Sequence, residues 1–357
     1  MRLARERHEF ILRELQLNGS VRVADLVIAL ESSEATLRRD IRELADAGLL
    51  TRVHGGAVAA PAEQPGTAAP VPVGIVVPST TFYYPGVIRG AESAANALGI
   101  RLVLGVSHYR PDEERERVAR LLALGVRGLL LAAAQGSSAA AELGAWLDTL
   151  PVPVVLMERT VGYAHTTRDV DYVRTDHAQG ALLALRHFAS LGHRKVALAL
   201  DPATPTEFWL RCGYAEAVEV LGLATDAPDV PVPDGAKDPE GLRSALRRLL
   251  RECRETGATA AFVHSDNQAT RLVEAAIADG LRVPGDLAVI AYDDEIAALG
   301  PVPLTAVSPP KYDVGEQAVR VMARRFVPHP GTTVTPHHLT LLPRLTIRES
   351  CGKRLIG

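Results

Sequence analysis

The spacing of apolar residues predicts a helix followed by a small wing near the start of the chain. Between residues 32 and 57 (SSEATLRRDIRELADAGLLTRVHGGA), Leu37, Ile41 and Leu44 recur at i, i+4 and i+7, so they share one helix face and are expected to be buried. Ser33 stands at the N-cap position of this helix, and Gly48 is expected to end it. Residues 49–53 then predict a short strand, and the following Gly55-Gly56 predicts a tight turn.

Two apolar segments precede this helix. Residues 10–17 form an apolar patch, and a short second helix is expected to begin near Val23 and to reach Leu30. Two helices joined by a short turn, the second with exposed arginines near its start, are typical of a DNA-reading helix-turn-helix. Arg39 and Arg42 lie opposite the buried face and Arg38 lies on its flank. Taken alone, such arginines more often only face solvent.

From residue 73 the pattern changes to short apolar runs that alternate with helical segments. Continuously apolar strands are typical of a parallel sheet that is covered on both faces, so the fold class is predicted as α/β with two doubly wound lobes. The expected strands are 73–77, 101–106, 128–131, 154–157, 196–200, 260–263 and 287–291. The expected helices are 87–98, 112–124, 139–150, 177–191, 211–221, 242–254, 267–279 and 312–326.

Residues 58–72 (VAAPAEQPGTAAPVP) contain four prolines and five alanines, which predicts an extended linker between two domains. The predicted organisation is a winged helix-turn-helix at residues 1–57, this linker, and a domain at residues 73–350, which the second resemblance described below implies to be an effector-binding domain. That resemblance implies one lobe of about 73–175 and 305–330, and another of about 176–304 and 331–350.

Composition excludes several classes of protein but does not by itself indicate a function. The net charge is −3, and the first 57 residues contain nine arginines and nine acidic residues, so any positive DNA-facing surface depends on where the charges lie. Three dispersed cysteines fit a reduced cytoplasm and argue against a disulfide framework or a zinc site. The chain shows neither a signal peptide nor an apolar run long enough to span a membrane, so a cytoplasmic location is expected.

Common enzyme motifs are missing from the sequence. It contains no phosphate-binding glycine loop, no GxSxG and no HExxH, so neither a cofactor nor a metal is expected. His177, His187 and His193 flank a predicted helix, where they are expected to cap it or to face solvent.

The N-terminal pattern resembles a known DNA-binding module. The segments NGSVRVADLVIAL and SSEATLRRDIRELADAGLLTRVHGGA resemble the winged helix-turn-helix of the DeoR family, with the ATLRRDI and RVHGGA blocks at the family spacing. The resemblance implies that operator DNA is a partner. The residues expected to contact DNA are Ser33, Ala35, Thr36, Arg38, Arg39, Arg42, Arg52, His54 and Gly55.

The rest of the chain resembles a second family. The phrases VRTDHAQGALLALRHFASLGHRKVALAL, RVPGDLAVIAYDD and RLTIRES resemble the effector-binding core of the LacI family, which is similar to periplasmic sugar-binding proteins. This resemblance implies two lobes joined by three crossovers, a small ligand in the cleft between them, and a homodimer formed through the core. The DeoR family's own sensor domain and the LacI hinge helix have no counterpart in the sequence.

Candidate ligand contacts follow from strand ends and from the LacI resemblance. Asp293 follows a strand, where its carboxylate could accept hydrogen bonds from vicinal hydroxyls; in the family this acid is a ligand contact. Asp266 could instead cap the next helix, and Glu158 and Arg159 could pair with each other. The family arginine is replaced by Leu210, so Arg211 or Trp209 is expected to substitute for it. The full set of expected ligand contacts is Tyr83, Tyr84, Glu158, Arg159, Trp209, Arg211, Ser265, Asp266 and Asp293.

Three functions compete at this point. The favoured interpretation is a transcriptional repressor that binds operator DNA and responds to a small effector, a sugar or a nucleoside. A solute-binding protein is the second, disfavoured by the winged helix. An enzyme acting on a sugar or sugar phosphate is the third, because Asp293, Glu158 and Asp266 could act as paired carboxylates, but no nucleophile motif accompanies them.

Overall fold

The computed structural model of the 357-residue chain describes residues 7–8, 10–12, 14–15, 20–30, 32–46, 50–53, 55–59, 70–134, 140–162, 164–327 and 334–352. The chain divides into two compact units, residues 1–69 and 70–357, each of which is described by itself. Residues 60–69 of the predicted linker lie outside the described ranges. Both ends of that linker belong to strands, because residues 58–59 close β3 and residues 71–72 open β4.

The first unit is a small helical bundle with a three-stranded wing. After helical residues between 7 and 15 come β1 (Ser20–Arg22), α2 (Val23–Leu30), α3 (Glu34–Asp46), β2 (Leu50–Val53) and β3 (Gly56–Ala59). The strands pair antiparallel in the order β1-β3-β2. Gly56 has to be glycine, because a Cβ atom there would lie 2.0 Å from the carbonyl oxygen of Val21.

The predicted core of this unit is confirmed. Leu37, Ile41 and Leu44 of α3 are buried and pack with Ile11 and Leu15 of the preceding helical residues. Each such side chain contributes about 1.5–3 kcal/mol relative to an exposed one, so the apolar face fixes which side of α3 faces outward.

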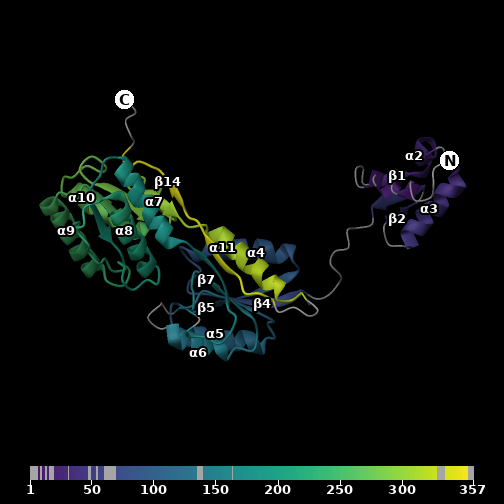
Figure 1. Cartoon of the computed structure of the whole chain (residues 1–357), viewed down its shortest axis with the longest axis horizontal. Helices are drawn as coiled ribbons and strands as arrows, with labels where there is room; N and C mark the ends of the chain where they lie inside the picture. The colour runs from purple at the N-terminus through teal and green to yellow at the C-terminus, as the bar shows by residue number, and fades with distance from the viewer. Residues whose placement is uncertain are drawn as a thin grey trace. The chain divides into compact units, whose positions relative to one another are not determined.

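The first lobe of the second unit is a six-stranded parallel sheet with the order β13-β8-β7-β6-β4-β5. Its strands are β4 (Val71–Val77), β5 (Ile100–Val106), β6 (Leu129–Leu131), β7 (Val154–Met157), β8 (Asp171–Thr175) and β13 (His338–Leu341). Figure 1 shows α4 (Tyr84–Ala97) and α11 (Lys311–Arg324) on one face, and α5 (Pro111–Ala123) and α6 (Ala140–Asp148) on the other. Both faces are therefore covered, which explains why the central strands are apolar throughout.

The second lobe is a five-stranded sheet with the order β14-β12-β11-β10-β9, in which only β14 runs antiparallel. Its strands are β9 (Val196–Ala199), β10 (Ala260–His264), β11 (Ala288–Tyr292), β12 (Thr305–Ser308) and β14 (Arg344–Thr346). Helices α7 (His177–Ser190) and α8 (Glu207–Leu221) cover one face, and α9 (Pro239–Thr256) and α10 (Asp266–Ala278) cover the other. The predicted α/β fold class is confirmed.

Two strands lie in the opposite lobes from those predicted. Residues 305–308 were expected in the first lobe, but β12 pairs with β11 of the second. Residues 338–341 were expected in the second lobe, but β13 pairs with β8 of the first. The chain thus crosses between lobes after β8, after β12 and after β13, and hydrogen-bond partners rather than apolar content decide where each short strand belongs.

Candidate functional site

Helix α3 presents a polar surface that its own N-cap and its burial orient. Ser33 Oγ accepts a hydrogen bond from the Thr36 backbone N–H at 3.2 Å, so the predicted N-cap is confirmed. Ala35 is exposed at the start of the helix and Thr36 is half-buried. In the wing, Arg52 and Gly55 are exposed, whereas His54 lies outside the described residues.

The arginines of α3 differ in their partners. Arg38 donates to Glu34 Oε1 at 2.6 Å, and Arg39 donates to Glu43 Oε1 at 2.9 Å. Both are exposed i,i+4 pairs, which are worth about 0.3–0.5 kcal/mol and exchange readily for a stronger anion. Arg42 is exposed and makes no hydrogen bond or ion pair to any described residue.

A buried ion pair fixes α3 against the first helical residues of the unit. Arg7 binds both carboxylate oxygens of Asp40, Nε to Oδ2 at 2.7 Å and Nη2 to Oδ1 at 3.0 Å. Burial of Asp40 opposes its ionisation, but these hydrogen bonds hold the pKa of Asp40 below its usual value. The pair therefore sets the register of the two segments.

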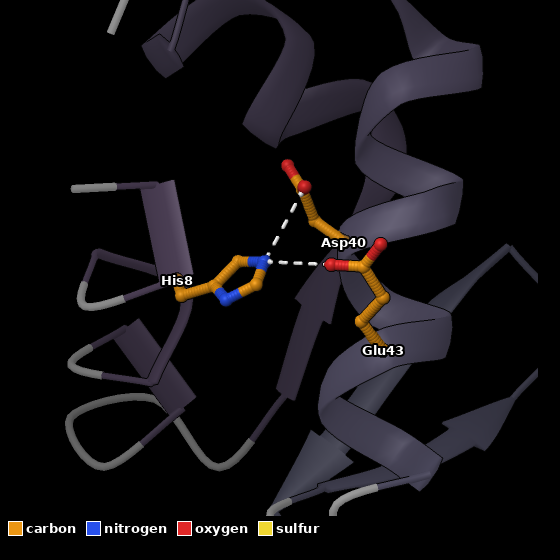
Figure 2. A group of neighbouring side chains, drawn as sticks. All are labelled: His8, Asp40 and Glu43. Atoms are coloured by element: carbon orange, nitrogen blue, oxygen red, sulfur yellow. Dashed lines mark hydrogen bonds and ion pairs between the residues drawn. The ribbon is translucent and has the colours of Figure 1, made fainter. Parts of the chain in front are cut away.

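Figure 2 shows His8 directed between Asp40 and Glu43. Its Nε2 lies 3.3 Å from Asp40 Oδ1 and 3.8 Å from Glu43 Oε2. Three such donors can hold a metal ion, and their ligand atoms all lie within 4.8 Å of one another. However, Arg7 already occupies both oxygens of Asp40, and Arg39 binds Glu43, so the group is an ion-pair network of the fold.

The second unit contains a cavity of about 700 Å³ lined by residues from both lobes. Most of the lining residues follow the carboxyl ends of parallel strands, which is where open α/β sheets bind ligands. Six of the nine expected ligand contacts line it: Tyr83, Tyr84, Glu158, Arg159, Ser265 and Asp293. Residues that the sequence reasoning missed include Ser79, Phe82, Tyr109, His177, Asp201, Thr204, Asp234, Lys237, His264, Asn267 and Gln268.

Glu158 connects the two lobes at the cleft. Its carboxylate accepts hydrogen bonds from the Tyr83 hydroxyl at 2.7 Å and from the Thr175 hydroxyl at 2.8 Å, both in the first lobe. His177 Nε2, at the start of α7 in the second lobe, lies 3.2 Å from Glu158 Oε2. Burial opposes the ionisation of Glu158, yet these partners hold its pKa at about 2.

His177 was expected to cap a helix or face solvent, and the structure shows neither. It is buried, its Nδ1 lies 2.6 Å from the Tyr292 hydroxyl, and Asp176 caps the helix instead. No sequence signal marked this role, because the Glu158 and Tyr292 partners are distant in the chain.

The cleft also concentrates strained backbone. Among the described residues, six non-glycine residues have positive φ. Four of the six line the cavity: Phe82 (φ 61°), Tyr109 (60°), Glu158 (57°) and Asp293 (103°). Such conformations cost about 1–3 kcal/mol each and persist where the surrounding structure holds side chains in place for function.

Three expected ligand contacts, Asp266, Trp209 and Arg211, do not line the cavity. Asp266 is buried and accepts hydrogen bonds from the backbone N–H groups of Asp294, Glu295 and Ile296, so it shapes the loop after β11. The N-cap of α10 is its neighbour Ser265, which does line the cavity.

Trp209 and Arg211 likewise face other groups. The Trp209 ring stacks with the Arg174 guanidinium at 4.3 Å, and Arg211 binds Glu207 and Asp229. Neither residue lines the cavity, so neither replaces the family arginine there.

Comparisons with known proteins agree with this architecture. Residues 7–62 match the DeoR-like helix-turn-helix domain, and residues 185–351 match the periplasmic binding protein-like domain. The ribose operon repressor of Escherichia coli (strain K12) is 31% identical over 280 residues, which cover 77% of this chain and 80% of that protein. The chain belongs to the LacI family of transcriptional regulators. It is a DNA-binding repressor under the control of a small ligand.

Other members of this LacI family support the same assignment. The regulator CelR of Thermobifida fusca is 31% identical over 271 residues, which cover 75% of this chain and 76% of that protein. The solved CelR–cellobiose complex superimposes with a TM-score of 0.67 and 25% identity, covering 89% of this chain and 91% of that one. No helix among the described residues is long and apolar enough to cross a membrane.

The Arg7–Asp40 pair yields a first prediction. Asp40→Ala leaves the Arg7 guanidinium without its main partner in a buried position, so the N-terminal unit should lose its fold and DNA binding. Glu34→Gln, which breaks only the exposed pair with Arg38, is the matched control and should change the thermal midpoint of that unit little. Thermal unfolding followed by NMR of the N-terminal amides checks this; equal midpoints for the two variants would contradict it.

Proposed function

We propose that the repressor binds its operator through α3 and the wing, and that a sugar bound in the cleft releases it from DNA. The observation that carries the proposal is the cavity lined from both lobes, with aromatic rings and strand-end carboxylates along its walls. A ligand that contacts both lobes can favour one lobe arrangement over another, which is the requirement for coupling to a second site.

The proposed DNA contacts lie at the start and on the outward face of α3 and in the wing. Phosphate contacts would come from Arg38 and Arg39, whose exposed ion pairs cost little to exchange, and from the exposed Arg52. Arg42, which has no partner among the described residues, is proposed to contact a base or phosphate directly. The remaining contacts are proposed at Ser33, Ala35, Thr36 and Gly55.

A sugar is the proposed effector. Tyr83 and Tyr84 supply aromatic surface, and Asp293 supplies a buried carboxylate that can accept two hydroxyl hydrogens. The CelR relative was solved with cellobiose, which supports the same ligand class for this cleft. We further propose a homodimer formed through the second unit, because two heads are needed to read a palindromic or repeated site.

The function is tested by a gel shift of the purified protein on the DNA upstream of its own gene. The shift is measured at two salt concentrations, with and without sugars and nucleosides. A specific, salt-sensitive complex that one sugar dissociates supports the proposal. A ligand that strengthens DNA binding would contradict the proposed release from DNA. No shift under any condition would count against this operator.

The recognition surface is tested by Arg42→Gln. The loss of one direct DNA contact should weaken operator binding by about tenfold or more, without changing sugar affinity. Arg251→Gln removes an exposed arginine of α9 in the other unit and serves as the control. Fluorescence anisotropy on labelled operator measures both, and equal affinities of the two variants would contradict the assignment of α3.

The role of Asp293 makes the sugar affinity depend on pH. Burial raises the pKa of Asp293 to about 6, despite the nearby Lys311, and only its ionised form accepts two hydroxyl hydrogens. Sugar affinity should therefore be level above about pH 7 and about tenfold weaker at pH 5 than at pH 7. Asp293→Asn should bind weakly at both values. Calorimetric titrations at constant ionic strength would contradict this if the unchanged protein binds equally at pH 5 and 7.

A further inference from the structure

The charged groups of the cleft disfavour an anionic ligand. Besides Glu158, whose oxygens are already hydrogen-bonded, three carboxylates line the cavity: Asp201, Asp234 and Asp293. Two cationic side chains, Arg159 and Lys237, line it as well.

Both cationic groups already have partners. Arg159 donates to the backbone oxygens of Ala133 and Glu158, at 3.0 and 2.8 Å. Lys237 Nζ lies 3.8 Å from Asp234 Oδ2. A phosphate group in the cavity would thus meet more carboxylates than available cations.

Buried Asp293 has a free hydrogen-bonding capacity. Its backbone oxygen accepts a hydrogen bond from Lys311, but its carboxylate accepts none from any described residue. A buried carboxylate without a donor is costly, so its position on the cavity wall calls for a ligand that supplies hydrogens.

His264, the last residue of β10, lies beside this carboxylate. Its Nε2 is 3.7 Å from Asp293 Oδ2, too far for a hydrogen bond, and its buried Nδ1 has no partner among the described residues. Burial lowers the pKa of His264 to about 4, so the ring is neutral at physiological pH and does not neutralise Asp293. A neutral ring keeps one N–H to donate.

We propose that the ligand is an unphosphorylated sugar, one hydroxyl of which donates its hydrogen to Asp293 and accepts the N–H of His264. The inference rests on the proposed function and makes His264 a specificity-determining residue of the same cleft. A single hydroxyl oxygen can reach both atoms because they lie so close together. It gives Asp293 a hydrogen and His264 Nε2 an acceptor at once, which a phosphate oxygen, lacking a hydrogen to donate, does not.

Ligand class is tested first, by isothermal titration of the full chain with matched pairs. The pairs are D-ribose against D-ribose 5-phosphate and D-glucose against D-glucose 6-phosphate, with cellobiose and D-glucosamine added. The expected result is that an unphosphorylated neutral sugar binds, and that its phosphorylated partner binds at least tenfold more weakly. Tighter binding of a phosphate ester or of D-glucosamine, or no binding by any neutral sugar, would overturn the proposal.

His264 is tested with the neutral sugar that binds most tightly in that panel. His264→Leu removes the N–H, and the affinity should fall about tenfold to hundredfold, since the buried sugar hydroxyl loses its donor. His264→Gln places an amide N–H near the position of Nε2 and should stay within about fivefold of the unchanged protein. His193→Gln, outside the cleft, is the control. Circular dichroism and the thermal midpoint check that each variant is folded.

Deoxy analogues of the same sugar separate contact from packing. The analogue that lacks the bridging hydroxyl should bind the unchanged protein about tenfold or more weakly than the parent sugar does. On His264→Leu its loss should be smaller, because only the hydrogen bond from the hydroxyl to Asp293 is left to remove. Equal losses on both proteins would overturn the contact. Operator binding without sugar is measured separately, so a failed sugar assignment is distinguishable from a failed regulator assignment.

Discussion

The carboxylate of Glu158 is the contact on which the arrangement of the cleft depends. An ionised group that is buried costs several kcal/mol unless it is fully hydrogen-bonded, and Glu158 has three donors in the first lobe and His177 at the start of the second. Tyr83 and Thr175 belong to the first lobe, and His177 begins the first helix of the second. His177 directly follows the crossover after β8, so this carboxylate lies where the chain passes from one lobe to the other.

The N-terminal unit applies the same physics on a smaller scale. The Arg7–Asp40 pair adds a directional contact to the apolar core that holds α3 in place. Asp40 faces inward on α3 while Arg39 and Arg42 face outward, so one helix carries both the structural and the recognition charges. This explains how a formally neutral segment can present a basic surface.

Much of this could be predicted from the sequence, because local signals and family resemblance agreed. The N-cap Ser33, the buried face of α3 and the apolar strands of both sheets are all properties of neighbouring residues. Short edge strands were less predictable: β13 has no apolar run, and only its pairing with β8 places it in the first lobe. The residues of the candidate ligand site were likewise predicted only in part. Strand-end residues such as Asp293 were found, whereas His177 and His264 depend on partners that are distant in the chain.

The central claim is that one ligand and one operator compete through a single lobe equilibrium. The most direct test measures the affinity of the full-length protein for its operator with and without saturating sugar, and its affinity for the sugar with and without operator. The account predicts that each weakens the other by the same factor, about 5–150-fold. Tight binding of both, with neither affinity changed by the other ligand, would contradict it.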